Sequence, residues 1–174
     1  MKYFVKFIVV TFFTLLCTYS LAEQKIVILD MKVVLNNSKA GKGAQDYLQK
    51  TFKDNQKKFS DNEKALKEEE KKLLEKKTIL TPEEYSKRSD ELRVKVVKYQ
   101  NERRASLEKI TAMRADARKK LLEKVDPILN NYIKENSISL VIDKKNVLGG
   151  NPEIDITSIV IEKLNKELPT LNLK

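Results

Sequence analysis

The chain has 174 residues, a net charge of +10 and one cysteine, and it lacks histidine and tryptophan altogether. Without histidine it cannot build a Ser-His-Asp or Cys-His catalytic device, and most zinc sites are excluded. Carboxylate or lysine chemistry stays open, but no carboxylate pair suited to acid-base work stands out. We therefore expect no enzyme, no metal and no cofactor.

Residues 1–22 have the pattern of a signal peptide. Two lysines give a basic start, residues 7–16 are apolar, and residues 20–22 form a small-x-small cleavage site before Glu23. We expect the mature chain to begin at Glu23 and to leave the cytoplasm. One alternative is an uncleaved membrane anchor, but the apolar run is shorter than the roughly 20 residues that cross a bilayer. The other is a lipoprotein, but the residues beside Cys17 are not the small ones that a lipid-attachment site requires.

The next segment predicts a short strand. Residues 25–30 contain an apolar run, 26–29, that is rich in β-branched side chains, which favours a buried strand over a helix of that length. Asn36, Asn37 and Ser38 follow, and their side chains are of the kind that cap a helix N-terminus. A helix is therefore expected from Lys39.

The middle of the chain lacks helix breakers. Between residues 44 and 148 it contains no glycine and only two prolines, so two helices are predicted, near 39–79 and 82–136. At about 1.5 Å per residue they would be about 60 and 80 Å long. A compact body cannot enclose helices of that length, so we expect a helical-hairpin arm, residues 39–136, that projects from the body.

The two prolines predict a turn and a kink. Thr81 can be the N-cap of the returning helix, with Pro82 at its first position and Glu84 completing a capping box. The tip of the arm is therefore expected near 78–85. Pro127 removes a backbone hydrogen bond, which predicts a kink near the body.

The apolar seam between the two helices is sparse. In the outgoing helix, apolar residues recur every seven positions, but the complementary heptad positions hold polar residues such as Asn55. The returning helix keeps the four-three spacing, with Arg103 and Ser106 as interruptions. We expect flexible arms that are stiffest at the root. The outgoing apolar positions are Phe52, Phe59, Leu66, Leu73 and Leu80.

The net positive charge after residue 22 lies on the arm. Residues 39–136 carry 26 basic and 18 acidic side chains, whereas 23–38 and 137–174 together carry 7 of each. Such charge attracts an acidic protein or an anionic lipid surface, or it simply solvates a helix. Nucleic acid is not expected, since no binding signature accompanies the charge. The main cluster includes Arg93, Lys95, Lys98, Arg103, Arg104, Arg114 and Arg118.

The C-terminal part returns to the body. Residues 137–143 have strand character, and their alternation places Ile138, Leu140 and Ile142 on one face. A turn at 149–152 precedes a final amphipathic helix capped by Asp155 or Thr157.

The predicted body, residues 23–38 and 137–174, has two or three strands and one short helix. About 55 residues cannot bury a self-sufficient core without disulfides or metal. We expect a homo-oligomer whose sheet is completed between subunits; a monomer whose strands pack on the arm roots is the alternative. The candidate oligomerisation residues are Ile26, Val27, Ile28, Leu29, Ile138, Leu140 and Ile142.

The order of these segments resembles the Skp family, also called OmpH, of periplasmic chaperones from Gram-negative bacteria. The resemblance spans about residues 25–168 and rests on a signal peptide followed by several short pieces in sequence. These pieces are Ile26 to Asp30, Ser38-Lys39-Ala40-Gly41-Lys42, Leu80-Thr81-Pro82-Glu83-Glu84-Tyr85, Leu140-Val141-Ile142-Asp143 and Asp155-Ile156-Thr157.

The resemblance implies an α+β fold, with a small β-rich trimerisation body and one long antiparallel helical hairpin projecting from each subunit. It also implies an ATP-independent holdase in the periplasm that keeps unfolded outer-membrane proteins in a cavity between the arms. A structural coiled-coil spacer and an envelope protein that binds anionic lipid are the alternatives. The candidate client contacts are Phe52, Phe59, Leu66, Leu73 and the seven cationic residues named above.

Overall fold

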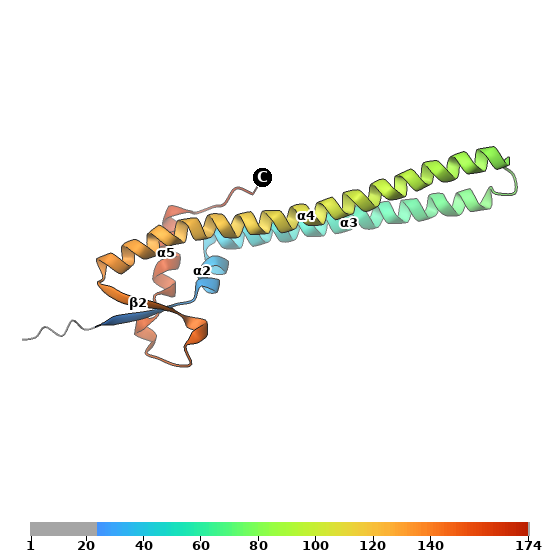
Figure 1. The fold of residues 1–174 in the computed structure, drawn as a ribbon. Coiled ribbons are helices and arrows are strands. Elements are labelled where there is room, and N and C mark those ends of the chain that lie inside the picture. The colour runs from blue at the N-terminus through green and yellow to red at the C-terminus, as the bar shows by residue number, and fades with distance from the viewer. Residues whose placement is uncertain (1–23, 174) are drawn as a thin grey trace, which may run out of the picture.

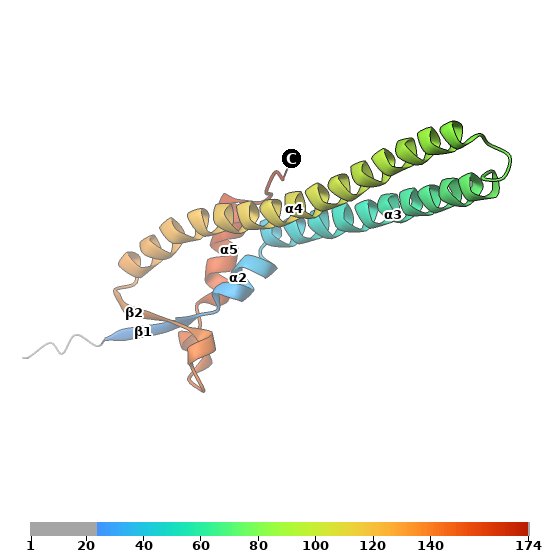
Figure 2. The ribbon, with the colours of Figure 1, turned by 45° about the vertical axis from the view of Figure 1, so that its right-hand side comes forward.

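A computed structural model describes residues 24–173. The predicted signal peptide lies outside these residues. Two long helices run side by side and project from a small body made by the remaining elements (Figures 1 and 2). Within residues 24–173 no helix combines the length and apolarity needed to cross a bilayer. The elements are β1 (Lys25–Leu29), α2 (Met31–Asn37), α3 (Lys39–Glu75), α4 (Pro82–Glu135), β2 (Ile138–Asp143), η1 (Lys144–Asn146), η2 (Pro152–Ile154) and α5 (Thr157–Glu167).

Helix α3 begins where the sequence predicts. Ser38 is its N-cap, and the buried Ser38 hydroxyl accepts a 3.1 Å hydrogen bond from the Gly41 amide. Gly41 is required here, because a Cβ at this position would lie 1.8 Å from the carbonyl oxygen of Leu35. The chain passes that close because α2 packs directly against the start of α3.

Helix α3 ends at Glu75, four residues before the expected end at 79. Ile79 is 81% exposed, so no packing stabilises a further turn. Thr81 and Glu84 form the predicted capping box at the start of α4, with Pro82 at its first turn. Helix α4 continues through Pro127 and curves over the body near that end (Figure 2).

Helix α2 was not predicted from the sequence, which suggested only a connection between strand and arm. Asp30 is its N-cap, and Asp30 Oδ1 accepts a 2.8 Å hydrogen bond from the Val33 amide. Val34 and Leu35 are buried in the body. This short helix therefore gives the body a larger core than the strands and the final helix alone would supply.

The two strands pair in parallel, and a β-bulge changes which residues face the core. Lys25 aligns with Ile138, but Ile26 aligns with Leu140, so one residue of β2 is extra. The prediction that Ile138, Leu140 and Ile142 share a face is therefore wrong. Ile138 and Val141 pack on the core, whereas Leu140 is 51% exposed. A bulge shifts the alternation by one residue.

Two apolar clusters hold the subunit together. The first lies in the body, where β1 and α2 meet the root of α4 and α5; its most enclosed members are Val34, Val125, Val160 and Leu164. The second lies at the arm root and consists of Ala44, Leu48, Ile110, Ala117 and Leu173. Between residues 60 and 109 no side chain is fully buried, so apolar packing decreases from root to tip.

Candidate functional site

The candidate apolar contacts of α3 lie mainly in the seam of the arm. Phe59 is buried, Leu66 and Leu73 are half-buried, and only Phe52 is exposed, at 44%. Three of the four therefore pack between the helices and offer little surface to another molecule. The exposed apolar side chains of the arm lie at other positions, which were not predicted from the heptad spacing: Tyr47, Leu74, Ile79, Val94, Val97 and Leu107.

Polar contacts occupy much of the seam that apolar residues leave unfilled. The Asn55 amide donates a 2.7 Å hydrogen bond to Ser106 Oγ, and the Tyr99 hydroxyl donates one of 3.4 Å to Glu63. Phe59 and Tyr99 meet edge to face, with ring centroids 6.0 Å apart. The arm is held by a few specific contacts rather than by a continuous apolar stripe.

Glu63 is also paired along its own helix. Lys67 Nζ lies 2.8 Å from Glu63 Oε1, and this hydrogen bond is the main cause that lowers the pKa of Glu63 and raises that of Lys67. Nearer the tip, Lys95 forms an ion pair with Glu69 across the two helices. Both pairs are solvent-exposed, so water and salt screen them and each contributes little to stability.

A groove of about 270 Å³ opens at mid-arm, beside the edge-to-face pair. Phe52, Phe59 and Leu107 give it apolar walls, and Arg103 adds a cation. Arg103 forms no ion pair with any residue in 24–173. The structure thus brings two predicted aromatic residues and one predicted cation together at one place on the arm.

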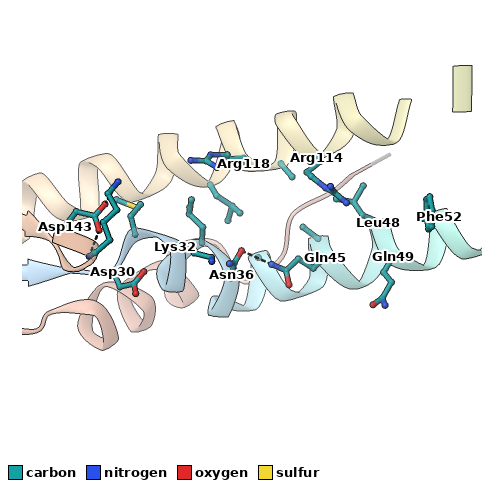
Figure 3. Close-up of a pocket in the computed structure, with 17 residues that line it drawn as sticks. Asp30, Lys32, Asn36, Gln45, Leu48, Gln49, Phe52, Arg114, Arg118 and Asp143 are labelled. Carbon is teal, nitrogen blue, oxygen red and sulfur yellow. Dashed lines mark hydrogen bonds and ion pairs between the residues drawn. The ribbon is translucent and has the colours of Figure 1, made fainter. Parts of the chain in front are cut away.

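A larger cavity, about 930 Å³, lies at the arm root between α2, α3 and α4 (Figure 3). Arg114 and Arg118 line it from α4, one helical turn apart, and Lys32 lines it from α2. Leu35, Leu48 and Leu121 are among its apolar lining residues. Its cationic and apolar groups lie close together, which suits a ligand that is both acidic and apolar.

The acidic groups of this cavity are already engaged. Asp30 caps α2, and Asp143 Oδ2 lies 3.1 Å from Lys145 Nζ. The backbone amide of Lys145 is the main cause that lowers the pKa of Asp143. Arg114 and Arg118 form no ion pair among the described residues, so their charge is available to a ligand.

The remaining predicted cations do not join this cavity. Arg93 pairs with Asp90 at 3.1 Å, Lys98 lies 4.0 Å from Glu102, and Arg104 donates to Asn101. Together with Lys95 they are spread along α4 towards the tip. The predicted cationic cluster is therefore several separate sites along one helix.

The sheet divides the seven candidate oligomerisation residues between two faces. Val27, Leu29 and Ile138 belong to the subunit core. Ile26 and Leu140, which are neighbours in the parallel pair, are 40% and 51% exposed. Ile28 and Ile142 are also neighbours on that face, where Ile28 is buried and Ile142 half-buried. The second face is thus apolar and partly uncovered.

Residues 24–173 contain no cluster of acidic side chains placed to hold a metal ion. Comparison with known proteins gives a clearer assignment. The protein family described as outer membrane protein (OmpH-like) matches residues 25–164. This chain belongs to the OmpH-like family.

Two proteins show the extent of the similarity. A Skp-like protein of Pseudomonas aeruginosa is 26% identical over 166 residues, which cover 95% of this chain and 99% of that protein. A crystal structure from Caulobacter crescentus, described as an OmpH-like outer membrane chaperone, superposes with a TM-score of 0.79 at 20% identity. The match covers 86% of this chain and 88% of that one. These two chains thus share one fold at low sequence identity.

Proposed function

We propose that this protein is an ATP-independent periplasmic holdase that binds unfolded outer-membrane proteins between helical arms before their insertion into the membrane. The observation that carries the proposal is the uneven packing of the arm. The body and root bury apolar side chains, whereas residues 60–109 bury none fully and leave Val94, Val97 and Leu107 exposed. Such a surface can make many weak contacts with an unfolded chain.

The client chemistry fits these surfaces. Strands of outer-membrane barrels alternate apolar and polar residues, and they aggregate through unpaired edges in water. The mid-arm groove and the root cavity both combine apolar walls with arginine. Cations attract an acidic client at long range, and the apolar walls retain it by many small contributions. A client that has folded into the membrane no longer exposes what the arms bind, so release needs no ATP.

We further propose a homotrimer joined through the bodies. The second sheet face, with Ile26 and Leu140, is apolar and exposed in one subunit. Strand β2 also has no second neighbouring strand among residues 24–173, so its outer edge can pair with another subunit. Three arms projecting from one joined body would enclose a space for the client.

The structure offers less support to the two alternatives. A rigid spacer would need a continuous apolar seam, whereas Asn55 and Ser106 interrupt it with a polar contact. A protein that binds anionic lipid by charge alone would not need the exposed Val94 and Val97. The described arm has both kinds of group, which favours an unfolded polypeptide as the ligand.

The experiment is to dilute a urea-denatured outer-membrane barrel into buffer with the mature chain and to follow light scattering. We expect scattering to fall at a few-fold molar excess of trimer, and the capture to slow but persist at about 0.5 M salt, where charges are screened beyond a few ångströms. Unchanged scattering would contradict the holdase function. Complete loss of capture in salt, together with binding to anionic vesicles, would favour the lipid alternative.

Arg114→Gln with Arg118→Gln should slow capture at low salt, because both cations line the root cavity. The matched control is Lys57→Gln with Lys64→Gln, which removes the same charge from exposed positions of α3. Equal slowing by both pairs would show that only net charge matters and that the root cavity makes no specific contribution.

A further inference from the structure

The segment after α5 folds back onto the arm root. Residues 168–173 have no regular secondary structure and lie beside α3 and α4 (Figures 1 and 3). Leu171 and Leu173 both pack with the second apolar cluster, and Leu173 is only 7% exposed. We call residues 169–173 the tail. Its two leucines pack between α3 and α4 of its own subunit, at a place that we call the arm-root groove.

The groove exists because small residues face each other across the seam. Ala44 of α3 and Ala117 of α4 are both buried there, whereas leucine-sized residues at these positions would close the space. Leu48, Ile110 and Met113 form its other apolar contacts. Leu173 is buried in the same apolar cluster as the two alanines.

Only the leucines attach the tail. Within residues 24–173, no backbone or side-chain hydrogen bond is made by residues 169–173; the last one is from the Leu168 amide to the Leu164 carbonyl. Thr170 and Asn172 are exposed. From Thr170 to Leu173 the tail therefore has polar residues outward and apolar residues inward at alternate positions, as a half-buried β-strand does.

From this geometry we infer that the arm-root groove is a binding site for an extended segment with apolar side chains at alternate positions, and that the tail occupies it as an intramolecular competitor. The identity of the natural ligand, a strand of an unfolded outer-membrane barrel, rests on the proposed function. Such strands have the same alternation as Leu171-Asn172-Leu173.

A tethered competitor raises the apparent Kd of an outside peptide, which equals the intrinsic Kd divided by the fraction of time that the site is free. A short tether gives an effective concentration in the millimolar range. If the tail is bound about nine-tenths of the time, its removal strengthens binding of an outside peptide about tenfold. Occupancy of nine-tenths requires an effective concentration about nine times the Kd, so the peptide itself should bind with a Kd of roughly 0.1 mM.

The test uses the mature chain, a version that ends at Leu168, and the peptide Pro-Thr-Leu-Asn-Leu-Lys, the sequence of residues 169–174. Peptide is titrated while the methyl NMR signals of Ile110 and Ala117 are followed. We expect saturable shifts in the shortened chain at about tenfold lower peptide concentration than in the mature chain. Shifts that never appear, or that need equal peptide in both chains, would overturn the inference.

Two controls separate a binding groove from a structural clasp. An isomeric peptide, Pro-Thr-Asn-Leu-Leu-Lys, has adjacent leucines and should bind weakly if alternation matters. Ala117→Leu in the shortened chain fills the groove and should abolish the shifts of Ile110. If shortening merely lowers the melting temperature and neither peptide binds, the tail is a clasp and the inference is wrong.

Should the shortened chain fail to fold, Leu173→Ser in the mature chain answers the same question, because it keeps the chain length and removes the buried side chain. This variant should bind the peptide as tightly as the shortened chain is expected to. The readout needs no barrel client. If the chain binds the peptide but does not suppress barrel aggregation, the proposed function is wrong and the binding groove is still supported. If the chain suppresses aggregation but does not bind the peptide, only the inference about the groove is wrong.

Discussion

The side chains of Asn55 and Ser106 are joined by a 2.7 Å hydrogen bond across the arm, Asn55 being the donor. Asn55 stands at a heptad position where a coiled coil would place an apolar residue, and both residues are half-buried. A polar pair in such a seam fixes the alignment of two helices and reduces their stability. The arm thus gains a defined register at the cost of stiffness.

Replacing this pair with apolar residues should stiffen the arm. We expect Asn55→Leu with Ser106→Ala to raise the free energy of unfolding by about 1–2 kcal/mol, because partly buried apolar surface replaces two polar groups. Urea denaturation at fixed protein concentration measures the change. Asn62→Leu is the control, since Asn62 is exposed and should change stability by less than about 0.5 kcal/mol. A lower stability of the double variant would show that the hydrogen bond is a net stabiliser of the arm.

Phe59 should matter more to the arm than Phe52, although both stand in the same heptad series. Phe59 is buried against Tyr99, whereas Phe52 is half exposed. We expect Phe59→Ala to cost about 3 kcal/mol and Phe52→Ala about 1 kcal/mol or less. Hydrogen exchange should accelerate between residues 60 and 108 in the Phe59 variant, because no fully buried side chain lies beyond it to hold the helices together. Equal effects of the two variants would contradict the burial that distinguishes them.

The two faces of the sheet should respond differently to substitution. Leu140→Lys places a charge on the exposed face, and we expect the proposed trimer not to form while each subunit keeps its helical content. Ile138→Ala removes a core side chain and should cost about 2–4 kcal/mol of stability without changing the face that we propose as the subunit interface. Analytical ultracentrifugation and thermal denaturation measure the two effects. A trimer that tolerates Leu140→Lys would place the subunit interface elsewhere.

Helix-capping residues allowed much of the arm to be predicted from the sequence. Ser38, Thr81 and Glu84 have side chains that bond backbone amides three residues away, so the sequence alone placed both helix starts correctly. The bulge in β2 could not be predicted from the sequence, because no local residue pattern indicates it. It follows Ser137, whose φ of 52° is in a region that serine seldom occupies, and the alternation of Ile138, Leu140 and Ile142 gives no hint of it.

The candidate site shows the same division. Heptad spacing identified the seam residues Phe59, Leu66 and Leu73, but seam residues face the partner helix and not a ligand. Val94 and Val97 are exposed because they fall between the seam positions, and apolar residues outside a repeat carry no spacing signal. The root cavity needs α2, which was not predicted, so Lys32 could not be grouped with Arg114 and Arg118 before the structure was known.

Lys144 and Asp155 should make the stability of the body depend on pH. Lys144 Nζ lies 2.6 Å from Asp155 Oδ2. Desolvation alone would raise the pKa of Asp155, but hydrogen bonds from Lys144 and Thr157 outweigh it and lower the pKa. The hydrogen bond to Asp155 is the main cause that raises the pKa of Lys144.

The direction of each shift sets the pH window. A lowered carboxyl pKa contributes stability above the unfolded value of about 3.9, and this contribution is lost as pH falls through the lower folded pKa. A raised lysine pKa contributes below about 10.4 and is lost as pH rises through the higher folded pKa. The pair should therefore stabilise the body fully between about pH 5 and pH 9.

A double-mutant cycle with Asp155→Asn and Lys144→Met isolates the pair. Urea denaturation at pH 3, 7 and 9 should give equal coupling at pH 7 and 9. The coupling should be weaker at pH 3, below the ordinary aspartate pKa of about 3.9, because the unfolded chain then binds a proton at Asp155. The asparagine that replaces Asp155 can still accept a hydrogen bond from the Thr157 amide, which Asp155 Oδ1 accepts at 2.9 Å in the native chain. Coupling near zero at pH 7 would mean that Thr157, and not Lys144, holds the carboxylate in the folded body.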